Sequence, residues 1–257
     1  MTSRTESHPT WNCPPLRPMT SNEVAVADGF YSSISDNATW PSGAMETAGL
    51  ELRVALMLLE KGGSFPAADN PFWKRKCRSL FLRPAMEPIA STYWGRFGVL
   101  DVDASTALKM ASALAGRPLV YRKGPAIGQS ATGDVHFGPL VSVDDWLQNM
   151  QRVARTPELL PGLPVYCFAN TIMTHPFSDG NGRVARVMVH AALARNLGLD
   201  SPKIALAPAF YRRGEALASA LNTLNEHGDW SKINRVFFSV LDEAALLTRA
   251  LHSRICR

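Results

Sequence analysis

The stretch Thr174-His-Pro-Phe-Ser-Asp-Gly-Asn-Gly-Arg183, with Arg186 shortly after it, carries the clearest structural signal in this chain. It lies between two segments whose apolar residues repeat at helical spacing. Gly180 and Gly182 have no Cβ atom, so neighbouring backbone N–H groups can converge on one point. The positive end of the following helix faces the same point. The stretch therefore predicts a loop that binds an anion.

The charged side chains of this stretch suit a bound polyphosphate. Arg183 and Arg186 share one face of the opening helical turn, and guanidinium groups bind phosphate oxygens through paired hydrogen bonds. Asp179, the one carboxylate of the loop, would repel an anion unless a hard cation such as Mg²⁺ lay between them. His175, with an ordinary pKa of about 6.5, can accept a proton at neutral pH. Together these groups predict attack by an activated nucleophile on a nucleotide phosphorus.

Each of these residues also has an ordinary structural explanation. A histidine near a helix end is commonly structural, a Gly-Asn-Gly sequence is commonly a turn, and two solvated arginines need no ligand. Arginine at the start of a helix is, however, slightly disfavoured by the helix dipole, and a bound anion would remove that penalty. The joint occurrence of all the pieces favours a phosphate site.

Outside this stretch the chain divides into three predicted regions. Its 257 residues suffice for one large domain with an appendage. Residues 1–40 are rich in proline and small polar residues and predict a loop-rich or flexible N-terminal arm. Residues 41–100 predict helices that pack on the core, the first running from about Ser42 to the glycines after Lys61. Residues 101–257 form the main domain.

The main domain has a helical pattern that is interrupted once. Predicted helices cover residues 104–115, 143–155, 165–172, 184–198, 208–226 and 230–253. The segment 118–139 is punctuated by glycine and proline, and Leu119-Val120-Tyr121 and Val135-His136-Phe137 within it predict two strands of a hairpin. The fold class is therefore mainly α, a helical bundle with a small β-hairpin.

Composition limits the partners. The net charge of +5 slightly favours phosphate-bearing ligands, and the basic and aromatic surface expected for a nucleic-acid partner is missing. The run Lys74-Arg75-Lys76 is either a solvated helix face or a docking patch for an acidic partner. No apolar run reaches the ~20 residues that span a bilayer, and no secretory signal is present. The four cysteines form no C-x-x-C pair. We therefore expect a cytoplasmic protein with no nucleic-acid or membrane partner; export by a signal-less route is the alternative.

The motif resembles the signature of the Fic family (filamentation induced by cAMP), H-x-F-x-[D/E]-G-N-G-R-x-x-R. All the defined positions are matched, by His175, Phe177, Asp179, Gly180, Asn181, Gly182, Arg183 and Arg186. The resemblance covers roughly residues 104–251, and the segment 118–139 is similar to the flap that precedes the motif in this family. It implies a Fic-type helical bundle with a β-hairpin flap.

The resemblance also implies an activity, which is transfer of AMP from ATP to a Tyr, Thr or Ser hydroxyl of a target protein with release of pyrophosphate. In that role His175 would deprotonate the hydroxyl, and Asp179 would hold the Mg²⁺ that bridges the phosphates. Phe177 would be the buried anchor of the loop. The expected cofactor is therefore Mg²⁺, with ATP as co-substrate.

The remaining motif residues would bind the nucleotide. Gly180, Asn181 and Gly182 would form the anion cradle, Arg183 would support the phosphates, and Arg186 would pair with the terminal one. The flap would align the target chain by strand addition. The flap residues expected to do so are Tyr121, Val135, His136 and Phe137.

Other functions of the same loop stay open. The related Doc proteins, which phosphorylate, lack the Gly-Asn-Gly-Arg set, so its presence here favours nucleotidyl transfer. Family members that move UMP or phosphocholine show that the loop does not determine the donor. A transferase acting on a small molecule and an autoinhibited nucleotide-binding module are further alternatives. The motif predicts neither the target protein, nor the preferred base, nor the oligomeric state.

Many Fic proteins are restrained by a helix reading [S/T]-x-x-x-E-[G/N], whose glutamate pairs with the second motif arginine, here Arg186. The nearest match is Ser42-Gly-Ala-Met-Glu46, but Thr47 stands where glycine or asparagine is expected. Glu46 is otherwise a helix-start carboxylate with Ser42 as its N-cap. A second candidate is Asp36. Without an internal inhibitor, a separate antitoxin-like partner or no restraint at all would be left.

Overall fold

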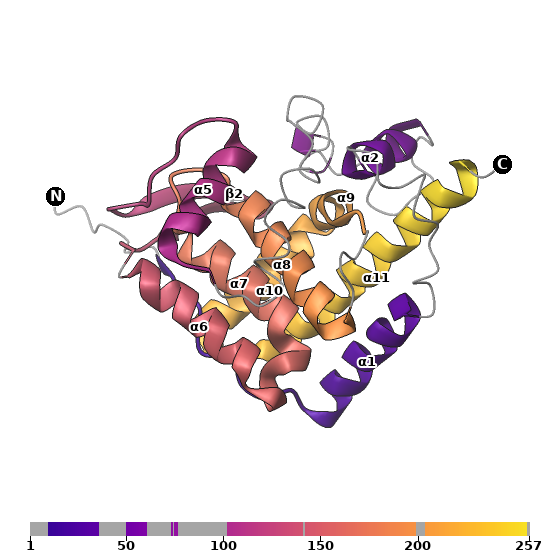
Figure 1. Ribbon diagram of the computed structural model, residues 1–257, viewed down its shortest axis with the longest axis horizontal. Helices are drawn as coiled ribbons and strands as arrows, with labels where there is room; N and C mark the ends of the chain where they lie inside the picture. The colour runs from indigo at the N-terminus through magenta and orange to yellow at the C-terminus, as the bar shows by residue number, and fades with distance from the viewer. Residues whose placement is uncertain are drawn as a thin grey trace, which may run out of the picture.

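A central pair of helices organises the molecule. The computed structural model describes residues 10–35, 50–60, 73, 75–76, 102–140, 142–198 and 204–255. In Figure 1 the pair α7 (Leu163–Thr174) and α8 (Asn181–Leu197) lies between α6 (Val143–Arg155) and α11 (Trp230–Ile255), with a small sheet at one side. The mainly α fold with a small sheet is as predicted. The other elements are α1 (Ser21–Ser35), α2 (Leu50–Glu60), α5 (Ala104–Ala115), the 3₁₀ helix Pro157–Gly162, α9 (Leu206–Arg212), α10 (Gly214–His227), β1 (Thr10–Trp11), β2 (Ala126–Ser130) and β3 (Gly133–Phe137).

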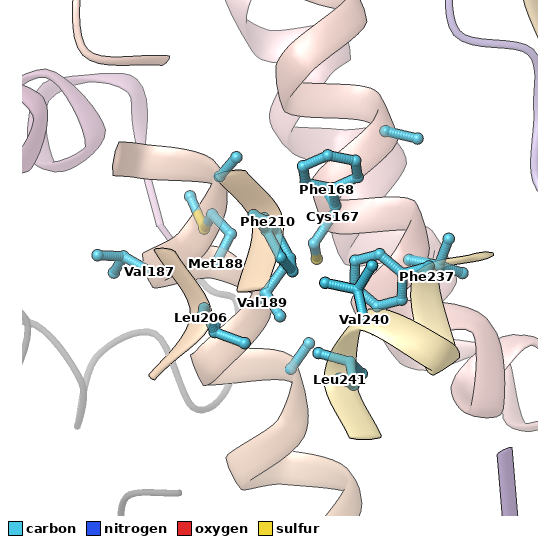
Figure 2. Packing of buried hydrophobic residues seen from close by; sticks show 14 of the residues in the cluster. Cys167, Phe168, Val187, Met188, Val189, Leu206, Phe210, Phe237, Val240 and Leu241 are labelled. Carbon is cyan, nitrogen blue, oxygen red and sulfur yellow. The ribbon is translucent and has the colours of Figure 1, made fainter. Parts of the chain in front are cut away.

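The two central helices are buried on nearly all sides. Every residue of α8 from Arg183 to Ala194 is buried, as is most of α7. A helix without a polar face belongs in a core, where neighbours cover all of it. Figure 2 shows side chains of α7, α8, α9 and α11 meeting there. They include Cys167, Phe168, Val187, Met188, Val189, Leu206, Phe210, Phe237, Val240 and Leu241. The loop between α7 and α8 is therefore held at both ends by the core.

Local signals set several helix ends where the sequence predicts them. Asp103 caps α5 by accepting a hydrogen bond from the Thr106 N–H, and Gly116 ends the helix in the left-handed region. Ser142 caps α6 in the same way. Gly198 ends α8, also with a positive φ. The predicted bounds 104–115 and 143–155 are confirmed.

The helix predicted over residues 208–226 is wrong in one respect, because two helices occupy this segment. The chain turns at Arg213, between α9 and α10. Arg212 and Arg213 both form ion pairs with Glu243 of α11, the second at 2.7 Å. Successive side chains of a continuous helix point about 100° apart, so the break brings both guanidinium groups onto one carboxylate.

The loop-rich arm predicted for residues 1–40 is also wrong for much of its length. Residues 21–35 form α1, which begins with a capping box in which Glu23 accepts from the Thr20 N–H at 2.7 Å. Ala27, Phe30 and Ile34 are buried, and their spacing places them on one helix face. Phe30 of that face meets Phe238 of α11, and Figure 1 shows α1 lying along α11. Because many polar residues surround these three, the sequence was interpreted as a loop and the amphipathic helix was not predicted.

The segment before α1 is attached to the C-terminal helices. The Trp11 indole N–H donates to Asn222 Oδ1 at 3.0 Å, and the Trp230 indole N–H donates to the Pro15 carbonyl at 3.0 Å. Trp11 belongs to β1, which pairs in parallel with β3. The N-terminus thus completes a three-stranded sheet in the order β1-β3-β2.

The hairpin exists, but its first strand was predicted in the wrong place. β2 is Ala126–Ser130, and it pairs antiparallel with β3 through a turn at Ala131 and Thr132. Residues 119–121 instead pair with the motif: Tyr121 bridges Phe177, and the Ser178 N–H donates to the Val120 carbonyl at 3.0 Å. β2 has only Ile127 as a residue that favours strands, whereas the shorter segment 119–121 has Val120 and Tyr121, so propensity alone pointed to the wrong segment.

Two further predictions concern the region before residue 102. α2 shows the predicted helix over Leu50–Glu60, with Val54, Ala55, Met57 and Leu58 buried. The start of that helix near Ser42, its glycine stop and most of residues 71–100 lie outside the described residues. Within the described chain, no helix is both long and apolar enough to cross a bilayer.

Candidate active site

His175 ends α7 in a conformation that side chains rarely adopt. Its φ of 50° and ψ of 56° lie in the left-handed region, and no other non-glycine residue among those described has a positive φ. Such a backbone costs on the order of 1–3 kcal/mol and persists only where the surroundings hold it. The His175 N–H donates to the Thr171 carbonyl at 3.1 Å. The turn directs the chain out of α7 and into the loop.

The imidazole of His175 is enclosed by the flap. It stacks on Phe137 of β3 with ring centroids 4.1 Å apart and planes inclined by 22°. Burial lowers the pKa of His175 to about 4, and the charge of Arg122 acts in the same direction, whereas the Ile172 carbonyl and Asp179 oppose them. The ring is therefore neutral at neutral pH and can accept a proton.

Phe177 is the buried aromatic side chain of the loop. Its side chain is fully buried, stacks on Tyr121 with centroids 5.1 Å apart, and meets Trp146 edge to face at 5.5 Å. Asn181 holds the backbone of the same residue: Asn181 Oδ1 accepts from the Phe177 N–H at 2.9 Å, and Asn181 Nδ2 donates to the Phe177 carbonyl at 2.8 Å. The Asn181 side chain thus shapes the loop, and only its backbone N–H is available for an anion.

The start of α8 has the features of an anion site. Gly180 precedes the helix with a φ of 77°, and its carbonyl accepts from the N–H groups of Arg183 and Val184. The N–H groups of Asn181 and Gly182 are the first-turn donors that a helix does not use internally. No acidic residue occupies this first turn. The positive end of the helix is therefore not neutralised by an acidic side chain of its own first turn.

The two motif arginines are buried, which excludes the interpretation as a solvated pair. Arg183 is 7% exposed and Arg186 is 3% exposed. Arg183 donates to the Leu114 carbonyl at the end of α5. Arg186 donates to the Gly182 carbonyl at 2.9 Å, and its guanidinium lies 5.5 Å from the centre of the Tyr211 ring. Two guanidinium groups are thus enclosed beside the positive end of a helix.

Asp179 lies at the mouth of the loop, about half exposed. Arg117 Nη2 lies 3.0 Å and Arg183 Nη2 3.5 Å from Asp179 Oδ2. Burial raises the pKa of Asp179, but the Gly180 N–H and the Arg117 charge outweigh it and lower the pKa overall, so the carboxylate is ionised. No group of three His, Cys, Asp or Glu side chains within the described residues would bind a metal. A magnesium ion here would need phosphate and water oxygens besides Asp179.

Two arginines of this site carry no role in the sequence interpretation. Arg117, two residues after α5, pairs with Asp179. Arg122 donates to backbone carbonyls at the end of α7 and at both ends of the hairpin. No spacing rule marks either residue. Asp179 lies more than 50 residues from Arg117, and Thr174 and His175 lie more than 50 residues from Arg122.

The proposed flap residues divide into two groups. Val135, His136 and Phe137 belong to β3, and the first and last of them are buried. Tyr121 lies outside the hairpin, and its hydroxyl donates to the Ala104 carbonyl at 2.6 Å. The exposed hydrophobic residue of the hairpin is Ile127 of β2. The inhibitory candidates Ser42, Glu46 and Asp36 lie outside the described residues.

Part of this chain matches a known protein family, and its fold is similar to a solved structure. Residues 140–193, which include the whole motif, match the Fic/DOC family. The chain is similar to the crystal structure of a Fic family protein from Desulfovibrio desulfuricans G20, with a TM-score of 0.62 and 16% identity, over 95% of this chain and 78% of that one. It is also similar to residues 134–508 of Fic-1 from C. elegans, with a TM-score of 0.45 and 14% identity, over 91% and 71% of the two chains. A comparison with curated proteins gives no match.

Proposed function

We propose that this chain, a Fic family protein, transfers AMP from ATP to a hydroxyl group of a target protein. Membership of the family by itself indicates the coarser activity, transfer of a nucleotide or another phosphate-containing group to a protein. The observation that carries the proposal is the pairing of a neutral, enclosed histidine with an anion site built from a helix start and two buried arginines. A base and a phosphate site side by side suit transfer at phosphorus.

In the proposed step, a Tyr, Thr or Ser oxygen of the target attacks the α-phosphorus of ATP. The hydroxyl proton passes to His175, a bond forms between that oxygen and the α-phosphorus, and the bond from the α-phosphorus to the bridging oxygen breaks. Pyrophosphate leaves. Nδ1 of His175 is buried, so Nε2 is the nitrogen proposed to take the proton. Arg183, Arg186 and the first N–H groups of α8 would stabilise the phosphate charge.

Asp179 is the residue proposed to hold Mg²⁺. Its carboxylate is ionised, as a ligand for a hard cation must be, and it is half exposed. Magnesium would neutralise phosphate charge when bound. Arg117, which now pairs with Asp179, would have to share or leave that carboxylate. An exposed pair of this kind is worth ~1 kcal/mol or less, so its loss is a small obstacle.

The outer edge of β2 is the proposed docking edge for the target. A target segment would pair with the flap through main-chain hydrogen bonds. The opposite edge of the hairpin, on β3, is already paired with β1, and Trp11 of that strand meets Phe137 edge to face at 5.9 Å. On β2, Ile127 is 68% exposed and Gln129 is also exposed. These two side chains are available to a target.

Labelled nucleotides test the proposal. The full chain, Mg²⁺ and a cell extract would be incubated separately with labelled ATP, UTP, CTP and GTP. We expect label from ATP on protein hydroxyl groups, with loss of labelling in His175→Ala. His227→Ala is the matched control, because His227 is exposed and far from the motif in the sequence.

Each other result identifies a different function. Label from another nucleotide alone would keep the transferase and reject AMP. A free labelled product would indicate a small-molecule acceptor. Binding of ATP with no labelled product of any kind would reject the enzyme and favour a nucleotide-binding module. Mass spectrometry of the labelled extract would identify the modified residue.

A further inference from the structure

One arginine joins the end of α7 to both ends of the flap. Arg122 Nε donates to the His175 carbonyl at 2.9 Å, and Nη2 donates to the Thr174 carbonyl at 3.0 Å. Nη1 donates to the Gly138 carbonyl at 2.6 Å and to the Gly124 carbonyl. Gly124 lies just before β2 and Gly138 just after β3. All three nitrogens of the guanidinium therefore bind main-chain oxygen.

The four acceptors suit a planar cation. The last carbonyls of a helix have no partner within it, and they lie at the negative end of the helix dipole. The guanidinium has five N–H donors in a fixed fork, whereas a lysine ammonium is a point charge on a flexible stem. Among the described residues, Arg122 forms no ion pair with a carboxylate. The Arg122 side chain therefore binds backbone carbonyls and not a carboxylate.

These bonds fix two rings that touch each other. The His175 carbonyl belongs to the residue whose backbone is held in the left-handed region. Gly138 directly follows Phe137, whose ring stacks on the His175 imidazole. The backbone N–H of Arg122 also donates to the Pro176 carbonyl at 2.8 Å, on the other side of His175. A single residue thus holds the main chain next to both members of the stacked pair.

We propose that Arg122 is a positioning residue that fixes the His175 imidazole against the flap. The proposal rests on the proposed function only in treating His175 as the base. Arg122 does not contact the anion loop, since its partners precede Phe177 or belong to the hairpin. It acts through geometry and through its charge, which Arg122→Lys and Arg122→Gln separate. Arg235→Lys is the matched control, because Arg235 is exposed on α11.

NMR tests the proposal without any transferase assay. The C–H signals of the His175 ring report its titration, and amide exchange of residues 126–137 reports opening of the flap. In Arg122→Gln we expect the His175 midpoint to rise by about half a pH unit or more, because a nearby positive charge is lost. The other charged group acting on the ring is Asp179, which stays in place. Arg122→Lys should keep a midpoint close to that of the unaltered chain.

Amide exchange in the flap separates the effect of the geometry of Arg122 from the effect of its charge. In both Arg122 variants, we expect amide exchange in β2 and β3 to become at least about ten-fold faster, with α11 unchanged, because neither lysine nor glutamine can bind the four carbonyls. Arg235→Lys should change neither quantity. Unaltered flap exchange together with an unaltered His175 titration in Arg122→Gln would overturn the proposal.

Kinetics add a readout that loss of structure would not reproduce. If label transfer occurs, Arg122→Lys should lower kcat at least about ten-fold while the KM for ATP changes less than about two-fold, because the anion site is untouched. An equal rise in KM would overturn the positioning role. If no transfer occurs in the unaltered chain, the proposed function fails, and the NMR result still decides the role of Arg122.

A measurement on the unaltered chain covers the case in which both variants unfold. The Arg122 Nε–H proton should exchange slowly with water, and rotation about its guanidinium bonds should be hindered, as expected for a group bound to several carbonyls. An Nε–H that exchanges as fast as that of Arg235 would overturn the proposal.

Discussion

At His175 the backbone and the side chain have different structural roles. The left-handed backbone turns the chain from α7 into the loop, and the side chain stacks on Phe137. Asn181 shows the same division, since its amide closes the loop on Phe177 while its backbone begins α8. A residue of a motif can therefore be required for shape, for chemistry or for both, and substitutions separate these roles.

The low pKa of His175 predicts an unusual pH dependence. If His175 is the base, kcat/KM of the free enzyme should stay level from pH 8 to about 6 and fall only as the pH approaches about 4. An ordinary histidine would lose activity near ~6.5. A pH profile of label transfer measures this limb, and a midpoint near 6.5 would contradict burial of the ring. Because the folded pKa lies below the unfolded one, stability from this group is present above pH ~6.5 and is lost as the pH falls toward about 4.

Asn181→Ala should destabilise the protein. The substitution leaves the Phe177 N–H and carbonyl, both buried, without their partners. We expect a loss of about 2–4 kcal/mol in the free energy of unfolding, measured by urea denaturation. Asn149→Ala is the control, because Asn149 is on α6 and its side chain is only partly buried. Equal stability of the two variants would show that the loop does not depend on the Asn181 amide.

At the scale of the element, α1 is part of the folded core. Phe30 is 2% exposed and meets Phe238 of α11 with ring centroids 6.0 Å apart. Phe30→Ala should lower the free energy of unfolding by about 3–5 kcal/mol. Val26→Ala on the same helix, where the side chain is 49% exposed, should change it by less than about 0.5 kcal/mol. If residues 1–40 were a flexible arm, neither substitution would matter.

The hairpin offers a second element-scale test, because Gly128 lies under the ring of Phe137. A Cβ atom at this position would lie 2.7 Å from Phe137 Cε2, too close for the ring to stay in place. Gly128→Ala should therefore shift the Phe137 ring away from His175 and cost about 1–3 kcal/mol. The His175 ring signals in NMR measure the displacement. Gly124→Ala is the control, since a Cβ atom there meets nothing within 4 Å; identical spectra for both variants would contradict the packing.

At the scale of the whole molecule, the core and the loop form one unit. α7 and α8 are each covered by several neighbours, so the loop between them cannot move without disturbing packed helices. Residues 10–17 reach across to α10 and α11 as well, and join the sheet to the helices. A rigid loop is what a phosphate site requires, because preorganised donors need no rearrangement when the charge develops.

Nucleotide binding should therefore stabilise the whole molecule. Mg²⁺ and ATP at about one hundred times the dissociation constant should add about 2.7 kcal/mol, or a rise in Tm of roughly 5–10 °C for a protein of this size. His175→Ala should keep this rise, because the ring is proposed to act on the target hydroxyl. Arg186→Met, compared with its own ligand-free Tm, should lose most of it. A full rise in Arg186→Met would remove Arg186 from the phosphate site.

The motif, the mainly α fold and most helix ends could be predicted because they depend on residues close together in the sequence. Asp103 and Thr106, or Gly180 and Arg183, interact across a single turn, so spacing and residue type determine what they do. β2 and α1 were missed for a different reason. Ala126–Ser130 is a strand because β3 pairs with it, although it has few residues that favour strands. Ser21–Ser35 is a helix that packs on α11, but its capping box and its apolar face lie among many polar residues.

By itself, the sequence determined which groups the loop carries: a histidine, a carboxylate, two glycines that flank an asparagine, and two arginines, all within twelve residues. The tertiary structure decided how those groups are held and what state they are in. It stacked Phe137 on His175, enclosed Arg183 and Arg186, paired Arg117 with Asp179, bound Arg122 to four carbonyls, and closed one edge of the flap with β1. Most of these contacts join residues tens of positions apart, and both burial and the pKa of His175 depend on which distant segments come together, which no local pattern records.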